Sequence, residues 1–451
     1  TTLAEAPSVG RLLAPEGTEG IASVDRLAGL DPHALAARFG TPAYVYDLDC
    51  IDRRFTALRA ALPQRVEIAY AVKANPALAI VTLLGRLGAG ADVASGGELA
   101  TALAAGVDPR RVVVTGPGKR DDELSAAVLA GVGAVTVESL RELGRLEAIA
   151  AARPALTAPV RVLLRLAVRD GARHERIRLI GDDGAGKFGM DVRDLRAAAR
   201  RAASSPHLRL VGLHAFGASN VVDAGALLAH ARDTVFAARA IARETRVPLE
   251  VIDVGGGLGI PYGDGEESLD IEALGRGFAT LTDELTRDPL LAGARLLVEP
   301  GRWLVGPAGA YLTRVVDRKV VGGRDVAIVD GGIHHVLRPA LVGEEHRLAA
   351  FPRDATPTET PRGRTRGPLT VAGPLCSGLD VLGRDAQLGD LDVGALVAVL
   401  DVGAYGFTES MPLFLSHPIP PEIAIRGGRA EVIRPRQEPE EWLRRQSVPT
   451  W

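Results

Sequence analysis

The chain has 451 residues, of which 47% are hydrophobic and 24% charged, the balance of a globular protein long enough for two domains. A formal net charge of −3 gives no electrostatic reason to expect nucleic acid or an anionic membrane surface as a partner. The two cysteines lack a metal-ligand spacing and no apolar run reaches about 18 residues, so the sequence predicts neither a disulfide scaffold nor a membrane span. We therefore expect a cytoplasmic protein.

Residues 1–30 are rich in Gly, Pro and Glu and predict a loosely ordered lead-in. From there to residue 305, short β-branched runs alternate with stretches of helical period, which predicts β-α units around a parallel sheet. Such units close into a (β/α)₈ barrel of the TIM type, whose chemistry lies at the C-terminal ends of the strands. The predicted strands are Val66–Val72, Ala91–Ala94, Val112–Thr115, Val135–Val137, Val160–Val168, Leu210–Phe216, Val251–Val254 and Leu296–Val298.

Residues 306–451 predict a second domain that is mostly β. Strand-like runs such as Val326–Val329, Leu369–Ala372 and Ala395–Val399 are separated by Gly, Pro and Asp, and helical stretches are scarce. Ala43–Tyr46, from the other end of the chain, is expected to add a strand to this domain. Arg353–Gly367 is rich in Pro, Thr and Arg and predicts an exposed loop. The chain is therefore predicted to be an α/β protein with a barrel and a β domain.

Lys73 follows the first predicted barrel strand. A buried lysine is unfavourable unless it is paired or used, and burial lowers its pKa, which makes the amine a nucleophile toward an aldehyde. The alternative is a lysine whose stem is buried while its ammonium reaches solvent.

Gly255, Gly256 and Gly257 follow the seventh strand, where backbone amides can approach a phosphate closely. Glu299 and Arg302 follow the eighth strand. A carboxylate and a guanidinium there could serve the two ends of one cofactor, a pyridine nitrogen and a phosphate. The alternative is an ordinary surface ion pair.

Together these motifs resemble the alanine-racemase-like (fold-type III) pyridoxal-phosphate enzymes, in the branch of diaminopimelate, ornithine and arginine decarboxylases. The resemblance extends over nearly all of the chain from about residue 30 onward. It rests on motifs in sequence order: Ala71–Asn75, Asp92–Ser95, Lys187–Gly189, Gly255–Gly257, Glu299–Arg302, Gly373–Cys376 and Gly403–Gly406.

The resemblance implies a decarboxylase that removes the α-carboxylate of an amino acid or its derivative, with pyridoxal 5′-phosphate as cofactor. Lys73 would carry the cofactor as a Schiff base, with Asp92 nearby, and Glu299 would face the pyridine nitrogen. The residues implied to hold the phosphate are Ser219, Gly255, Gly256, Gly257, Arg302 and Tyr405.

The resemblance also implies a homodimer with shared active sites. Cys376 and Tyr405 would enter each site from the partner chain, with the thiol as proton donor. Lys187 and Asp380 would pair between the chains. From the sequence alone, a lone cysteine is more often a small buried hydrophobe than a catalyst, although the glycines around Cys376 indicate an exposed turn.

Three departures from the family concern the substrate. Phe216 takes the place of the histidine that usually stacks on the cofactor. Ser377 takes the place of the acidic residue that grips a distal amine, and a neutral hydroxyl compensates an ammonium poorly. Arg338 is retained and is predicted to bind a polar end of the substrate, although the tyrosine that usually follows it is absent.

These departures resemble a narrower subgroup, some of whose members act on aminoacyl groups tethered to acyl carrier proteins. The shared stretches are Gly373–Asp380, Gly116–Lys119, Gly331–His335 and Ser416–Pro418. We therefore predict a substrate that is carrier-tethered or a natural-product intermediate. Three alternatives remain open: a diaminopimelate decarboxylase of lysine biosynthesis, a pyridoxal-phosphate-dependent racemase, and a non-catalytic regulator related to decarboxylases.

Overall fold

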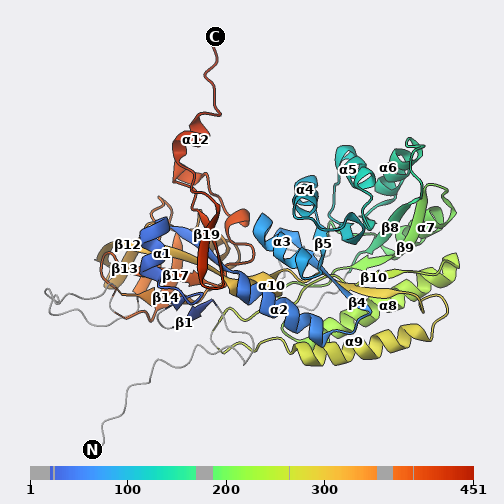
Figure 1. Ribbon diagram of the computed structural model, residues 1–451, viewed down its shortest axis with the longest axis horizontal. Helices are drawn as coiled ribbons and strands as arrows, with labels where there is room; N and C mark the ends of the chain where they lie inside the picture. The colour runs from blue at the N-terminus through green and yellow to red at the C-terminus, as the bar shows by residue number, and fades with distance from the viewer. Residues whose placement is uncertain (1–20, 24–25, 169–185, 264, 353–368, 390) are drawn as a thin grey trace, which may run out of the picture.

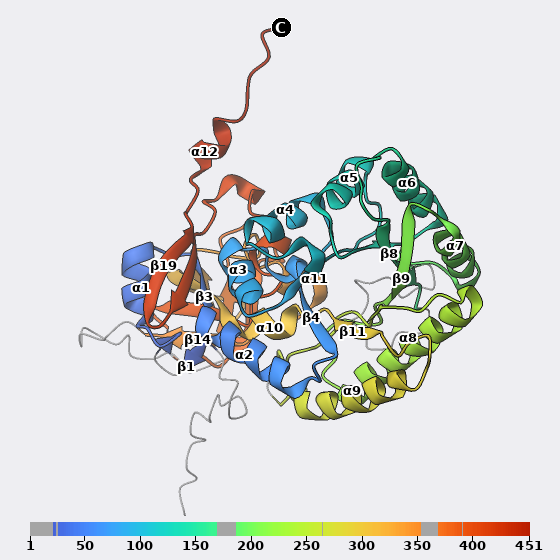
Figure 2. The ribbon, with the colours of Figure 1, turned by 45° about the vertical axis from the view of Figure 1, so that its right-hand side comes forward.

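A computed structural model describes residues 21–23, 26–168, 186–263, 265–352, 369–389 and 391–451. Eight parallel strands form a closed barrel in the order β10-β11-β4-β5-β6-β7-β8-β9 (Figures 1 and 2). This confirms the predicted TIM-type barrel. Its strands are β4 Val66–Ala71, β5 Gly90–Val93, β6 Val112–Val114, β7 Ala134–Val137, β8 Val160–Leu166, β9 Leu208–Ala215, β10 Val251–Asp253 and β11 Arg295–Val298.

The barrel strands are nearly continuous apolar runs because both faces are covered, by side chains inside and by helices outside. An inner layer of small and branched side chains, including Ala69, Leu163 and Val211, fills the barrel interior. The outer helices are α2 Leu48–Ala61, α3 Leu78–Arg86, α4 Gly96–Ala104, α5 Asp121–Ala130, α6 Leu140–Ala151, α7 Val192–Ser204, α8 Ala224–Thr245 and α9 Ile271–Thr286.

Several of these helices begin at a side-chain cap. Ser95, Ser139 and Asp270 each accept a hydrogen bond from a backbone N–H in the first turn of the helix that follows, which satisfies a donor that the helix leaves unpaired. The caps fix where each helix begins after its strand. They therefore also fix the loops between strand and helix, which form the mouth of the barrel.

The second domain is a nine-stranded sheet, mostly antiparallel. Within it β3 (Ala43–Asp47) pairs with both β12 and β18, although β3 precedes the whole barrel in the sequence. The other strands are β12 Gly309–Val321, β13 Arg324–Val329, β14 Leu348–Phe351, β15 Leu369–Ala372, β16 Val381–Ala386, β17 Leu396–Leu400, β18 Glu422–Arg426 and β19 Arg429–Arg434. The predominance of strands agrees with the predicted β domain.

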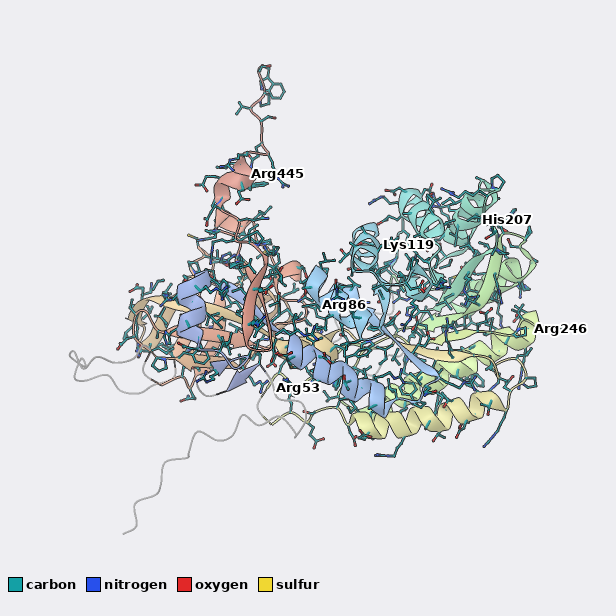
Figure 3. The ribbon with its side chains drawn as sticks, viewed as in Figure 1. Arg53, Arg86, Lys119, His207, Arg246 and Arg445 are labelled. Carbon is teal, nitrogen blue, oxygen red and sulfur yellow. The ribbon has the colours of Figure 1, made fainter. Side chains whose placement is uncertain are left out.

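Short helices complete the two domains. They are α1 Pro32–Phe39, α10 Arg302–Val305, α11 Arg338–Val342 and α12 Pro439–Leu443, with the 3₁₀ turn η1 Val72–Ala74 after β4. Figures 1 and 2 show α12 and the C-terminal residues projecting away from both domains. Arg445, labelled in Figure 3, lies on this projecting segment.

Of the predicted lead-in, residues 1–30, the structure describes only residues 21–23 and 26–30. Ile21 and Leu27 are buried in a small core with Val45, Leu312 and Ile423 of the second domain. Burying two large apolar side chains compensates the entropy of ordering this segment. The predicted loop Arg353–Gly367 lies outside the described residues. In the part of the chain that is described, no helix combines the length and hydropathy that crossing a bilayer would require.

Candidate active site

A cavity of about 260 Å³ lies at the C-terminal ends of the barrel strands. The second domain covers it with Arg338 and Glu344, from α11 and the loop that follows, and with Tyr405 and Glu409 from the loop after β17. Among the predicted site residues, the cavity is lined by Lys73, Phe216, Ser219, Glu299, Arg302, Arg338 and Tyr405.

Lys73 lies on the 3₁₀ turn η1 and points at Asp92. Its Nζ is 2.6 Å from Asp92 Oδ2, and Thr115 donates to the other carboxylate oxygen at 2.5 Å. Burial favours a neutral amine, but Asp92, Glu299 and Tyr405 together outweigh it, so the pKa of Lys73 is raised. The expectation that burial would lower this pKa is therefore wrong, because the sequence did not reveal how close the carboxylate lies.

Glu299 lies at the floor of the cavity beside two other buried titratable groups. Its Oε2 is 3.6 Å from His214 Nε2, and Asp253 is the third member. Burial disfavours the Glu299 carboxylate, but the neighbouring His214 and Lys73 favour it, and its pKa falls to about 2. Burial and the Glu299 charge raise the pKa of Asp253. The floor therefore presents one ionised carboxylate to the cavity.

Arg302 contacts both Ser219 and Tyr405, the other side chains predicted to hold a phosphate. Its Nη2 donates to Ser219 Oγ at 3.4 Å, and its guanidinium lies 4.8 Å from the centre of the Tyr405 ring. A hydroxyl, a guanidinium and a phenol thus converge at one end of the cavity. Such a donor set suits a phosphate dianion.

The three glycines after β10 lie behind these residues and do not line the cavity themselves. Gly255 has φ +71°, and a Cβ there would lie 2.9 Å from the Phe216 ring. A Cβ on Gly256 would meet the Glu299 carbonyl oxygen at 2.3 Å. The missing side chains therefore allow Phe216 and Glu299 to occupy their positions.

Tyr405 belongs to the cavity of its own chain. Its backbone N–H donates to the Ala74 carbonyl oxygen at 2.8 Å, which ties the loop after β17 to the turn that carries Lys73. The expectation that Tyr405 enters from a partner chain is therefore wrong. The reason is that the second domain folds back over the barrel mouth of the same chain.

Arg338 is buried between two acidic side chains that sequence reasoning missed. Its Nε donates to Glu344 at 2.7 Å and its Nη1 to Glu409 at 2.7 Å. Burial disfavours the guanidinium charge, but Glu344, Tyr262 and Glu409 together outweigh it, and the pKa of Arg338 is raised. Arg338 thus reaches the cavity with its charge already compensated. No sequence motif could have revealed this pairing, because the carboxylates lie in loops without a recognisable pattern.

Arg165 is a second residue that sequence reasoning missed. It lies at the end of β8, pairs with Glu138 at 2.7 Å, and its guanidinium is 4.7 Å from the centre of the Phe188 ring. Arg165 and Phe188 both line the cavity. The available signal was a charged residue at the end of an apolar strand run, the same signal that identified Lys73.

Cys376 and Ser377 do not line the cavity of this chain. Cys376 is exposed on the turn between β15 and β16, whereas Cys50 is buried, and the two form no disulfide. Lys187 is exposed, with its Nζ 5.2 Å from the centre of the Phe188 ring. A contribution of the thiol to an active site therefore requires a second copy of the chain.

The residues of the cavity fit pyridoxal 5′-phosphate. Both ring nitrogens of His214, Glu299 Oε1 and Arg302 Nε are buried without a hydrogen-bond partner in the protein. Unsatisfied buried groups are costly and call for a polar ligand. An ionised carboxylate suits a protonated ring nitrogen, and the Arg302 cluster suits the phosphate.

Residues 48–306 match the family described as "Pyridoxal-dependent decarboxylase, pyridoxal binding domain". The chain belongs to this family. It is a decarboxylase that depends on pyridoxal 5′-phosphate and acts on amino acids, as the sequence predicted. This finding favours decarboxylation over the racemase and regulator alternatives.

The decarboxylase is similar to curated proteins along most of its length. An L-glutamyl-[BtrI acyl-carrier protein] decarboxylase of Niallia circulans is 34% identical, covering 89% of this chain and 92% of the relative. A diaminopimelate decarboxylase of Methanothermobacter thermautotrophicus is 35% identical, and the match covers 94% of this chain and 95% of the relative.

Solved structures share the fold of the decarboxylase. The diaminopimelate decarboxylase of Helicobacter pylori in complex with L-lysine has a TM-score of 0.80 and 30% identity, covering 91% of this chain and 98% of that one. The diaminopimelate decarboxylase of M. jannaschii has a TM-score of 0.84 and 27% identity, and the match covers 94% of this chain and 96% of that one.

Proposed function

We propose that the decarboxylase removes the α-carboxylate of an amino acid whose other end is tethered to a carrier protein. Lys73 would hold the cofactor through its aldehyde, and Cys376 of a second copy would donate a proton to the carbon that loses CO₂. Pyridoxal 5′-phosphate, when bound, withdraws electrons from the bond to the departing carboxylate.

The residues of this chain orient the reactants. Asp92 and Thr115 hold the Lys73 amine in place before the cofactor arrives. Glu299 stays ionised and would keep a proton on the ring nitrogen of the bound cofactor. Ser219, Arg302 and Tyr405 would hold the phosphate, and Phe216 would supply a neutral aromatic surface for the ring.

The charge balance of Arg338 carries the proposal for a tethered substrate. Arg338 pairs with Glu344 and Glu409, and Arg302 Nη1 also lies 3.7 Å from Glu344, so two guanidinium groups already face these two carboxylates and neither is free to grip a distal amine. Ser377 supplies no charge. A free diamino acid would leave its distal ammonium uncompensated in this cavity, whereas a thioester-linked substrate has no charge at that end. Similarity to the carrier-linked glutamyl decarboxylase supports the same substrate class.

Decarboxylation assays compare carrier-bound L-glutamate with free glutamate, lysine, ornithine and diaminopimelate, using CO₂ release as the readout. We expect kcat/KM for the carrier-bound substrate to exceed that for each free amino acid by at least about 100-fold, the effect of leaving a buried polar group unpaired. Fast turnover of free diaminopimelate would refute the tethered substrate and favour the second candidate, diaminopimelate decarboxylation, which the similarity to the archaeal enzyme supports.

A further inference from the structure

Glu344 lies between the two arginines at one end of the cavity. Its Oε2 is 2.7 Å from Arg338 Nε and 3.7 Å from Arg302 Nη1. The Tyr405 ring lies against both guanidinium groups, with its centre 4.8 Å from that of Arg302 and 5.2 Å from that of Arg338. A single carboxylate therefore faces two positive charges at this end of the cavity.

The backbone on both sides of Glu344 is fixed. Helix α11 begins at Arg338 and ends at Gly343, whose φ of +65° is a conformation that other residues rarely adopt. The chain reverses there and brings Glu344 back beside Arg338. On the other side, His346 Nδ1 donates to the Leu400 carbonyl oxygen at 2.8 Å, which ties the segment to β17. The local fold therefore keeps the carboxylate against the guanidinium.

Glu409 contacts Arg338 from a more open position. It accepts from Arg338 Nη1 at 2.7 Å, and its side chain is 31% exposed, against 4% for Glu344. An ion pair that water reaches contributes little and exchanges readily, whereas separating a buried carboxylate from its arginine is strongly unfavourable. An entering substrate can therefore displace Glu409 from Arg338 but not Glu344.

The pairing leaves Arg338 poorly suited to a carboxylate of the substrate. A guanidinium binds a carboxylate best through two parallel N–H groups on one edge. Glu344 takes Nε and Glu409 takes Nη1, which belong to different edges of the guanidinium plane. A third carboxylate entering here would lie beside the Glu344 charge, and like charges brought together in a contact repel strongly. A neutral group meets no such repulsion.

We propose that Glu344 is a specificity-determining residue that makes the cavity reject a substrate with a free distal carboxylate and accept one with a neutral distal end. The inference rests on the proposed function and names the residue that selects its substrate. Free glutamate, which carries a distal carboxylate, is rejected. Glutamate whose distal carboxylate is linked to a carrier as a thioester is accepted.

Glutarate and its monoamide, glutaramate, test this selection without a carrier protein. They differ only at one end, where glutarate has a carboxylate and glutaramate a neutral amide. Isothermal titration of the cofactor-loaded enzyme should give a Kd for glutaramate at least about tenfold lower than that for glutarate. In Glu344→Gln, which keeps the shape and removes the charge, glutarate should bind at least about tenfold more tightly, while the Kd for glutaramate stays within about threefold.

The neighbouring Glu345→Gln is the matched control, because Glu345 is exposed and the change in charge is the same. Its two Kd values should equal those of the unmodified enzyme. Glu344→Asp retains the charge and should retain the preference for glutaramate. Glu409→Gln should change the Kd for glutarate by less than about threefold, since that side chain is displaced more easily. A thermal melt checks that each variant is folded.

Two results would overturn the role of Glu344. The first is equal binding of glutarate and glutaramate to the unmodified enzyme, which needs no variant to fold. The second is a gain for glutarate that is absent in folded Glu344→Gln or is equally large in Glu409→Gln or Glu345→Gln.

Decarboxylation of free L-glutamate is a further readout, and its kcat/KM should rise by at least about tenfold in Glu344→Gln, whereas that for carrier-bound glutamate should not rise. The same assays separate this inference from the proposed function. If the Kd values shift as expected but the unmodified enzyme does not decarboxylate carrier-bound glutamate, the proposed substrate is wrong and the role of Glu344 stands. If carrier-bound glutamate is decarboxylated but the Kd values do not shift, the reverse holds.

Discussion

At the scale of single residues, the charge of Lys73 is controlled by Asp92. Only a neutral amine attacks an aldehyde, and the raised pKa of Lys73 keeps the amine protonated at neutral pH. In Asp92→Asn, only Glu299 and Tyr405 still oppose the effect of burial, so the pKa of Lys73 falls, and cofactor uptake should reach half its maximal rate at least about one pH unit lower. The measurement is the rate of appearance of the bound-cofactor absorbance after mixing apoenzyme with pyridoxal 5′-phosphate across pH.

The exposed Asp233→Asn serves as the control for this experiment, and its pH midpoint should equal that of the unmodified enzyme. If the pH midpoint of cofactor uptake in Asp92→Asn equals that of the unmodified enzyme, the Asp92 carboxylate does not control the pKa of Lys73.

Glu299 gives a second pH prediction, because its pKa is lowered whereas that of Lys73 is raised. Its pKa is depressed to about 2, so its contribution to stability is present above its ordinary value of about 4.3 and is lost only as pH falls through about 2. Glu299 is therefore ionised throughout the range in which activity is measured. In Glu299→Gln, we expect kcat to be lower by roughly 10²- to 10³-fold, by the same factor from pH 5 to pH 9.

Parallel pH profiles of kcat for Glu299→Gln and for the exposed control Glu272→Gln check this prediction. If the difference in kcat between Glu299→Gln and the unmodified enzyme disappears near pH 5, Glu299 titrates between pH 5 and pH 9. His214 would then not hold its pKa low.

At the scale of elements, the turn after β10 supports the cavity from behind. Gly255→Ala places a Cβ 2.8 Å from the Ala215 carbonyl oxygen and 2.9 Å from the Phe216 ring, at a φ that disfavours side chains. We expect a loss of about 1–3 kcal/mol in the free energy of unfolding, together with weaker cofactor binding as Phe216 shifts. Urea denaturation and a cofactor titration measure the two effects.

Gly293→Ala is the matched control, because nothing lies within 4 Å of its added Cβ and its φ is not positive. Its free energy of unfolding should change by less than about 0.5 kcal/mol. Equal losses in both variants would mean that the Gly255 turn has no special packing requirement.

The barrel strands were predictable because each is a short apolar run that ends in a polar or glycine-rich segment, and this pattern is local. Lys73, Glu299 and Arg302 were found by the same rule. The pairing of Arg338 with Glu344 and Glu409 was not predictable, because it depends on how the second domain folds over the barrel. The origin of Tyr405 was misassigned for the same reason. Sequence patterns thus locate strand ends but do not show which loops of another domain reach them.

At the scale of the whole molecule, the cavity is built from both domains. The interlocking begins in the sequence, since β3 precedes the barrel yet pairs with β12 and β18 behind it. Lys119 (labelled in Figure 3), buried against Glu142 at 2.6 Å, anchors the loop through which Gly116 and Pro117 line the cavity on the barrel side. Lys73 is thus surrounded within one chain, while Cys376 of that chain lies outside its own cavity.

If sites are shared between two copies, Lys73→Ala and Cys376→Ala should each be nearly inactive and should complement each other. A mixed dimer holds one site with both defects and one with neither. Random exchange makes half of all dimers mixed, so activity should recover to about a quarter of the unmodified level. Co-expression with two different affinity tags allows the mixed dimers to be isolated, and their activity should reach about half of the unmodified level. Mixed dimers that are isolated and remain inactive would mean that Cys376 acts in its own chain or not at all.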